Sequence, residues 1–210
     1  MRLRRGRAAP VLAEVPGRGG PATCSGVLRR DELEAYSGLV GALGGARVVL
    51  ATGPAKARVA VGLAAVAAVA GRRAALVEAD LAGPSLARVL GLEPAPGLHE
   101  YLCGEVGSQE ALQSLVLAGP ASGGATEPLT CVLAGEPGPP SLLDTDRCRQ
   151  ALAGLRESYE LVVVDGVPLD GERLALIALA EVADATLACG AARELRGKQP
   201  IPVTGLVAVA

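Results

Sequence analysis

One lysine and three acidic residues stand where apolar runs end. Lys56 follows the apolar residues 46–51, in the bend before an Ala-rich stretch, and Glu78, Asp80 and Asp165 close two later apolar runs. A phosphate-transfer site needs a cation to bind phosphates and carboxylates to hold Mg²⁺ or to orient the attacking group. These four residues are therefore the candidates for chemistry. For any one of the acids, a solvated cap at a strand end is the alternative.

Strands that alternate with helices would position these residues. Runs of β-branched and aliphatic residues predict strands, and longer amphipathic or Ala-rich runs predict helices. The expected strands are 46–51, 74–80, 128–135, 160–166, 185–190 and 203–210, and the expected helices are 31–45, 56–70, 84–92, 139–159 and 172–183. Short loops and no internal repeat predict an α/β fold, a doubly wound, mostly parallel sheet flanked by helices. Ligands bind such sheets beyond the carboxyl ends of the strands, where the four candidates would meet.

Composition excludes several classes of protein. The chain has 210 residues, a formal net charge of -2, no Phe or Trp and three Tyr. Aromatic platforms for stacking bases are missing and the surface is not generally basic, so no nucleic-acid partner is expected. Residues 1–30 are rich in Arg, Gly and Pro and predict an arm, and residues 31–210 predict a single α/β domain.

Cysteine usage and hydropathy bear on location. The five cysteines are scattered and form no C-x-x-C pair, which is typical of reduced thiols in the cytosol. The longest apolar stretch, residues 59–70, is shorter than the ~20 residues that span a bilayer. We therefore expect a cytoplasmic protein. The Arg-rich residues 1–7 are a solvated tail or a contact with anionic lipid at the inner face of the membrane.

Three segments carry a family resemblance. "GPAKAR" (53–58) lies at the position of a Walker A loop, "ALVEADLAGPSLARVLGLEPAPGLHEYLCGE" (75–105) is similar to a Walker A′ segment, and "LRESYELVVVDGVPL" (155–169) is similar to a Walker B strand. On these residues the chain, over about 10–190, resembles the cytoplasmic domain of the bacterial tyrosine kinases (BY-kinases) of capsule and exopolysaccharide biosynthesis. These kinases are relatives of the MinD and ParA deviant P-loop ATPases.

The resemblance implies ATP and Mg²⁺ as cofactors. In it, Lys56 of the loop that begins at Gly53 would hold the β and γ phosphates. Asp80 and Asp165 would take Mg²⁺, and Glu78 would orient or deprotonate the attacking hydroxyl. Arg58, on the same stretch, would clamp a phosphate or lie as a solvated helix residue. A membrane chain-length regulator of polysaccharide export would be the partner.

The loop departs from the family pattern around its lysine. Ala55 replaces a glycine, Ala57 replaces the hydroxyl residue that ligates Mg²⁺, Arg58 replaces the next hydroxyl, and the loop is shortened between Thr52 and Gly53. Fewer backbone N–H groups can then form an anion nest, and one direct Mg²⁺ ligand is lost. These changes predict a pseudoenzyme.

Two further family features are missing. Ser37 and Val40 stand where arginines used in ring assembly occur, and no tyrosine follows Tyr159. Self-association therefore stays open, and the first hypothesis is a BY-kinase-like protein that is impaired in ATP hydrolysis and tyrosine autophosphorylation and acts through protein contacts. One alternative is an active tyrosine kinase or ATPase with an atypical loop. The second is a MinD- or ParA-like partitioning or maturation ATPase.

Overall fold

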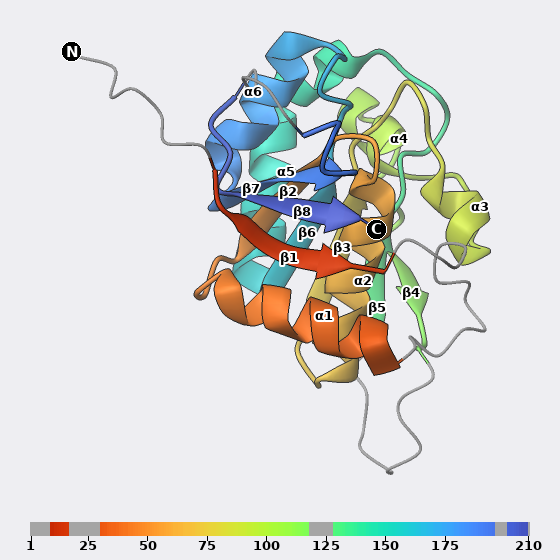
Figure 1. Ribbon diagram of the computed structural model, residues 1–210. Coiled ribbons are helices and arrows are strands. Elements are labelled where there is room, and N and C mark those ends of the chain that lie inside the picture. The colour runs from red at the N-terminus through yellow and green to blue at the C-terminus, as the bar shows by residue number, and fades with distance from the viewer. Residues whose placement is uncertain (1–8, 17–29, 118–127, 196–200, 210) are drawn as a thin grey trace.

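The computed structural model describes residues 9–16, 30–117, 128–195 and 201–209 (Figure 1). The strands are β1 (Val11–Val15), β2 (Val48–Thr52), β3 (Ala74–Glu78), β4 (Gln113–Leu115), β5 (Leu129–Val132), β6 (Leu161–Asp165), β7 (Ala185–Gly190) and β8 (Gly205–Val209). The helices are α1 (Arg30–Ala42), α2 (Lys56–Val69), α3 (Leu86–Leu90), α4 (Leu98–Cys103), the 3-10 helix η1 (Pro140–Asp144), α5 (Asp146–Ser158) and α6 (Arg173–Val182). Within these ranges, no helix has the length and apolar character needed to cross a bilayer.

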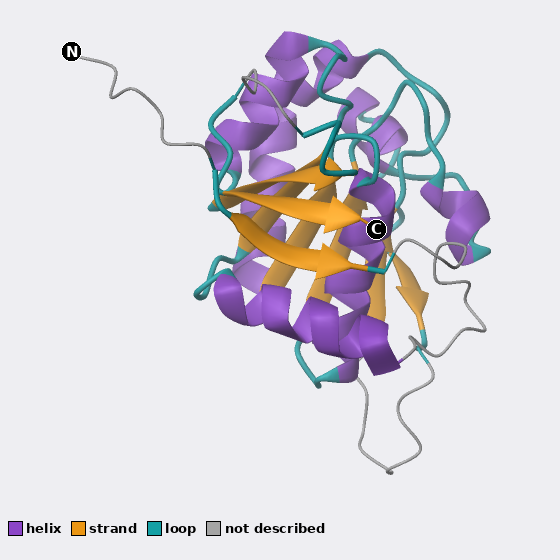
Figure 2. Ribbon diagram, in the orientation of Figure 1, coloured by secondary structure: helices purple, strands orange, loops and turns teal. Residues whose placement is uncertain are grey.

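The described strands form one eight-stranded sheet in the order β1-β8-β7-β2-β6-β3-β5-β4. All neighbouring pairs are parallel except β4 with β5, and helices cover both faces of the sheet (Figure 2). The prediction of a doubly wound, mostly parallel α/β sheet is confirmed. The central strands β2, β6 and β3 lie next to one another, so their carboxyl ends come together at one edge.

Alternation along the central strands builds two cores. Val49, Ala51 and Val163 face α1 and α2 on one side of the sheet, whereas Val48 and Leu50 face the side of α5 and α6. Both sides are buried, and every residue of β2, β3 and β6 is inaccessible or nearly so. Continuous apolar strands of this kind are expected where helices cover both faces of a parallel sheet.

Helices α1 and α2 pack closely because α2 has a glycine, Gly62, at the contact. The ring of Tyr36 lies over Gly62, where an added Cβ would overlap the ring atoms. The Tyr36 hydroxyl donates a hydrogen bond to the backbone oxygen of Arg58 (3.3 Å). Burial raises the pKa of Tyr36 to about 12. The contact fixes α1 against the helix that begins with Lys56.

Four features differ from the sequence-based expectation. Strand β1 lies within the stretch assigned to the arm, yet it pairs in parallel with β8 at one edge of the sheet. Most of the remaining arm, residues 1–8 and 17–29, lies outside the described residues. Strand β4 and helix α4 were not expected. The single helix predicted over 139–159 is η1 followed by α5, because the Thr145 side chain accepts the N–H of Cys148 and begins a new helix there.

Candidate functional site

Lys56, Asp80 and Asp165 meet at the carboxyl edge of the sheet. The Lys56 Nζ atom lies 3.0 Å from Asp80 Oδ2 and 3.0 Å from Asp165 Oδ1. Asp165 ends β6, Asp80 follows β3, and Lys56 begins α2 after β2, so three adjacent strands deliver the three side chains. The Asp165 side chain is fully buried and the Lys56 side chain is 10% exposed. The lysine predicted to bind phosphate is thus already bound to two carboxylates.

Burial and charge shift the pKa values of this cluster. Burial raises the pKa of Asp165 to about 6, and the attraction of Lys56 only partly opposes that rise. For Lys56, burial alone would lower the pKa, but the charges of Asp165 and Asp80 outweigh it and raise the value. The lysine is therefore held in its charged form, and its ammonium group is ion-paired with Asp80 and Asp165.

The backbone of the loop is closed on the protein itself. The N–H of Ala55 donates to the carbonyl oxygen of Cys189 in β7 (3.1 Å), and the N–H of Lys56 donates to that of Gly53 (3.2 Å). Gly53 has φ +98, and an added Cβ there would lie 2.5 Å from the Cys189 oxygen. A phosphate-binding loop presents such N–H groups to the anion. In this conformation these two N–H groups donate within the chain and are not presented to an anion.

Glu78 lies beside the cluster but makes different contacts. Its Oε1 accepts the backbone N–H groups of Ser85 and Leu86 at the start of α3, and its Oε2 accepts that of Ala134 after β5 (3.1 Å). The residue is 1% exposed. The carboxylate predicted to act on an attacking hydroxyl therefore accepts three backbone N–H groups. These hydrogen bonds fix the loop before α3 and the loop after β5.

Arg58 points to α1 and not to the cluster. Its guanidinium contacts Glu32 on α1 at 3.0 Å. The structure therefore brings together Lys56, Asp80 and Asp165 of the predicted site residues, with Glu78 on the adjacent loop side and Arg58 turned away. In this conformation Arg58 is neither placed to clamp a phosphate nor fully solvated, because it is ion-paired with Glu32.

Sequence reasoning missed one buried acid of this edge, Glu100. Its Oε2 accepts the N–H of Gly97 (2.7 Å) and its Oε1 accepts the N–H of Glu136 (2.8 Å). Burial would raise the pKa of Glu100, but these backbone hydrogen bonds lower it overall. Glu100 takes the N3 position of a capping box, but Gly97 has no side chain to complete it, so the Ser/Thr-x-x-Glu signature that could have identified the residue is missing.

The side chains at the site offer little to a metal ion on their own. Within residues 9–16, 30–117, 128–195 and 201–209, no group of three or more His, Cys, Asp or Glu side chains is arranged to hold one. Asp80 and Asp165 share the lysine between them, and Ala57 supplies no hydroxyl. A Mg²⁺ ion here would need the ligands that a nucleotide brings, together with release of Lys56.

The comparisons with known proteins bear on the fold. No protein-family model matches the sequence, and no curated protein matches it. Among solved structures, the chimeric protein CapA2B2 has a TM-score of 0.78 at 16% identity over 96% of this chain and 94% of that one. The kinase domain of the Escherichia coli tyrosine kinase ETK has a TM-score of 0.73 at 21% identity, covering 94% and 88%. MinD of Pyrococcus horikoshii with Mg-ADP has a TM-score of 0.51 at 18% identity, covering 69% and 58%.

These similarities define the class of fold. The chain has the α/β fold of the MinD- and ParA-like P-loop nucleotide-binding proteins. It is similar over nearly its whole length to the bacterial tyrosine kinase domain, which covers more of the chain than MinD does. The suspected resemblance is thus confirmed at the level of the fold, and activity is argued from the site itself.

Proposed function

We propose that the protein is a BY-kinase-like P-loop protein of capsule or exopolysaccharide assembly that acts through protein contacts. Its capacity to hydrolyse ATP or phosphorylate tyrosine is impaired. The observation that carries this proposal is the ion pairing of Lys56 with both Asp80 and Asp165 at 3.0 Å. A nucleotide would have to displace two carboxylates from the lysine before its phosphates could be bound.

The neighbouring backbone supports the same conclusion. The N–H groups of Ala55 and Lys56 donate to carbonyl oxygens of the protein, and Ala57 lacks the hydroxyl that would ligate Mg²⁺. Opening this loop would cost the closed hydrogen bonds, and the anion would gain fewer donors than a glycine-rich loop provides. The fold is kept while the site that usually accompanies it is closed.

The partner in this proposal is a membrane chain-length regulator of polysaccharide export. The regulator would bind the P-loop domain at the inner face of the membrane, where the Arg-rich residues 1–7 would add attraction to anionic lipid. The similarity to tyrosine kinase domains supports a contact of this kind. Co-purification with the regulator encoded near the gene tests it, and a neighbourhood without polysaccharide genes would favour a partitioning or maturation role.

A phosphotransfer assay on the purified protein tests the proposed loss of activity. We expect no Mg²⁺-dependent transfer of the γ-phosphate to tyrosine, in the protein itself or in a tyrosine-containing peptide. Clear transfer that depends on Mg²⁺ would overturn the proposal. An active tyrosine kinase domain assayed in parallel shows that the conditions support the reaction.

One observation favours the alternative of an active kinase or ATPase with an atypical loop. Among the described residues, the buried Asp165 Oδ2 atom has no hydrogen-bond partner. An unsatisfied buried carboxylate oxygen is costly, and a cation or a water held by a bound nucleotide would satisfy it. In this alternative the Lys56→Met variant loses turnover, whereas unchanged turnover would rule out a role for Lys56.

A further inference from the structure

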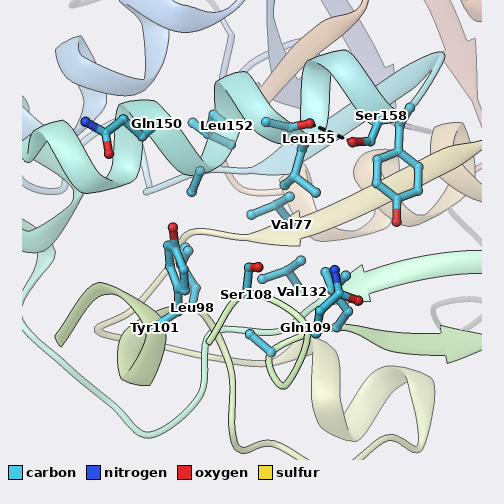
Figure 3. A pocket seen from close by; sticks show the side chains of 15 residues that line it. Val77, Leu98, Tyr101, Ser108, Gln109, Val132, Gln150, Leu152, Leu155 and Ser158 are labelled. Atoms are coloured by element: carbon cyan, nitrogen blue, oxygen red, sulfur yellow. Dashed lines mark hydrogen bonds between the residues drawn. The ribbon is translucent and has the colours of Figure 1, made fainter. Parts of the chain in front are cut away.

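A slot lies on the α5 side of the sheet, away from the site around Lys56. It lies between α5 on one side and α4 with the following loop on the other, and strands β3 and β5 form its floor (Figure 3). Its volume is about 520 Å³, which is within the range of pockets that hold small organic molecules. It shares no lining residue with the cluster of Lys56, Asp80 and Asp165.

Small residues leave this slot open. Ala151 and Gly154 on α5 and Ala111 opposite them line it, and the chain has no Phe or Trp to fill the space. A Cβ added at Gly154 would meet no atom within 4 Å. Gly154 is exposed, so the slot opens to solvent on the side of α5 and a ligand can enter it there.

The lining is apolar in the middle and polar but uncharged at the ends. Leu152 and Leu155 stand over Val77 and Val132 in the centre of the view (Figure 3). At one end are Tyr101 and Gln150, and toward the other are Gln109 and Ser158, whose hydroxyl donates to the Gly154 oxygen (2.9 Å). Among the described residues that line the slot, none carries a charge at neutral pH.

Arg147, which is outside the described lining, stacks on one of the lining residues. Arg147 lies 4.7 Å from the centroid of the Tyr101 ring, in a cation–π contact. A charged ligand would gain no opposite charge from the described lining residues, whereas a neutral one would bury apolar surface and keep hydrogen bonds at its ends.

We propose that the slot is a binding site for an uncharged, elongated organic molecule with an apolar middle and a hydrogen-bonding group at each end. Residues 150 and 158 of α5 are separated by about 12 Å at 1.5 Å per residue, which sets the length of the ligand. The proposal concerns a second site and does not depend on whether the loop at Lys56 binds nucleotide.

Titration of the whole protein with 1,10-decanediol tests this inference. The diol has the required length, a neutral chain and a hydroxyl at each end, and decanedioate is its charged match. We expect saturable one-to-one binding by calorimetry and by ¹⁵N–¹H spectra, with shifts confined to α4, residues 108–112, α5 and the floor strands β3 and β5. Decanedioate should bind at least tenfold more weakly. Equal binding of the dianion, or no saturation with the diol, would overturn the proposal.

Two positions on one helix provide matched variants. Ala151 lines the slot, whereas Ala153 is exposed and outside it. Ala151→Phe should weaken diol binding at least tenfold, and Ala153→Phe should leave it within twofold. Gly154→Leu is a second blocking variant for the case in which Ala151→Phe does not fold. If the blocking variant that folds binds the diol like the wild type, the site is not this slot.

Discussion

Two groups of buried or partly buried acids at the same edge of the sheet are stabilised in different ways. Asp80 and Asp165 face the ammonium group of Lys56, whereas Glu78 and Glu100 accept backbone N–H groups of the surrounding loops. The first group depends mainly on the side-chain charge of Lys56, for which a ligand could compete, although Asp80 Oδ1 also accepts the N–H of Gly83 (3.2 Å). The second depends on fixed donors that are part of the fold, which makes it a structural element that holds α3, α4 and the loop after β5.

This difference decides which acids could take part in ligand binding. The cluster around Lys56 could do so by rearranging side chains, whereas Glu78 could do so only with local unfolding. Phosphates would compete with Asp80 and Asp165 for Lys56, a contest between anions that a compact ion pair in a low-dielectric site resists. Glu78 could act on a substrate only if it released three backbone donors. The acids of this edge thus divide into one cluster that pairs with Lys56 and one pair that holds the surrounding loops by backbone hydrogen bonds.

The largest expected effect is that of Lys56→Met on the first group. Removal of the cation leaves two carboxylates facing each other, and loss of one partner of a buried ion pair costs about 3–5 kcal/mol in the free energy of unfolding. Chemical denaturation at pH 7 measures it. The double variant with Asp165→Asn should recover most of the loss. A single variant as stable as the wild type would show that the ion pair does not hold this edge.

The pH dependence of the first group follows from Asp165. Its pKa is raised by burial to about 6, so the folded state binds more protons than the unfolded state between about pH 4 and pH 6. The contribution of Asp165 to stability therefore falls as the pH rises through this window, by up to about 3 kcal/mol. Denaturation of the wild type and Asp165→Asn across that range checks it. A stability difference that is constant with pH would contradict the assigned pKa.

Glu78→Gln probes the second group without changing its shape. The amide supplies one acceptor and turns an NH₂ group toward backbone donors, so we expect a loss of about 2 kcal/mol. Glu105→Gln, at an exposed position after α4, is the matched control and should change stability by less than about 0.5 kcal/mol. Equal effects of the two substitutions would mean that Glu78 does not clamp the loops.

Glu100→Gln should give the smallest effect, about 1 kcal/mol at pH 7, because two backbone donors lose a charged acceptor. Burial opposes ionisation of Glu100, but its backbone hydrogen bonds lower the pKa overall, so its contribution is present at neutral pH and is lost as the pH falls through the lowered value. Thermal unfolding at steps from pH 7 to pH 3 measures both. A difference from the wild type that does not shrink as the pH is lowered stepwise below 4.5 would rule out this linkage.

The sheet and the meeting of Lys56 with Asp80 and Asp165 could be predicted, because strand order in a doubly wound fold brings strand ends together. The hydrogen-bond partners of each acid could not be predicted from the sequence. The contact of Glu78 with Leu86 depends on how a loop folds back, and closure of the phosphate loop depends on the carbonyl of Cys189, which any residue would supply. Every residue has a backbone carbonyl, so the sequence does not show which one accepts a hydrogen bond. A closed loop and an open loop therefore cannot be told apart from the sequence.

Calorimetric titration of the wild-type protein with ATP, with and without Mg²⁺, tests the central claim most directly. The claim is that the Lys56 side chain and the N–H groups of Ala55 and Lys56 are committed to the protein. It predicts no saturable binding at millimolar nucleotide in either condition, which corresponds to a binding free energy weaker than about -4 kcal/mol. Micromolar binding of Mg-ATP would contradict it, because the nucleotide would then displace Asp80 and Asp165 from the lysine at little cost.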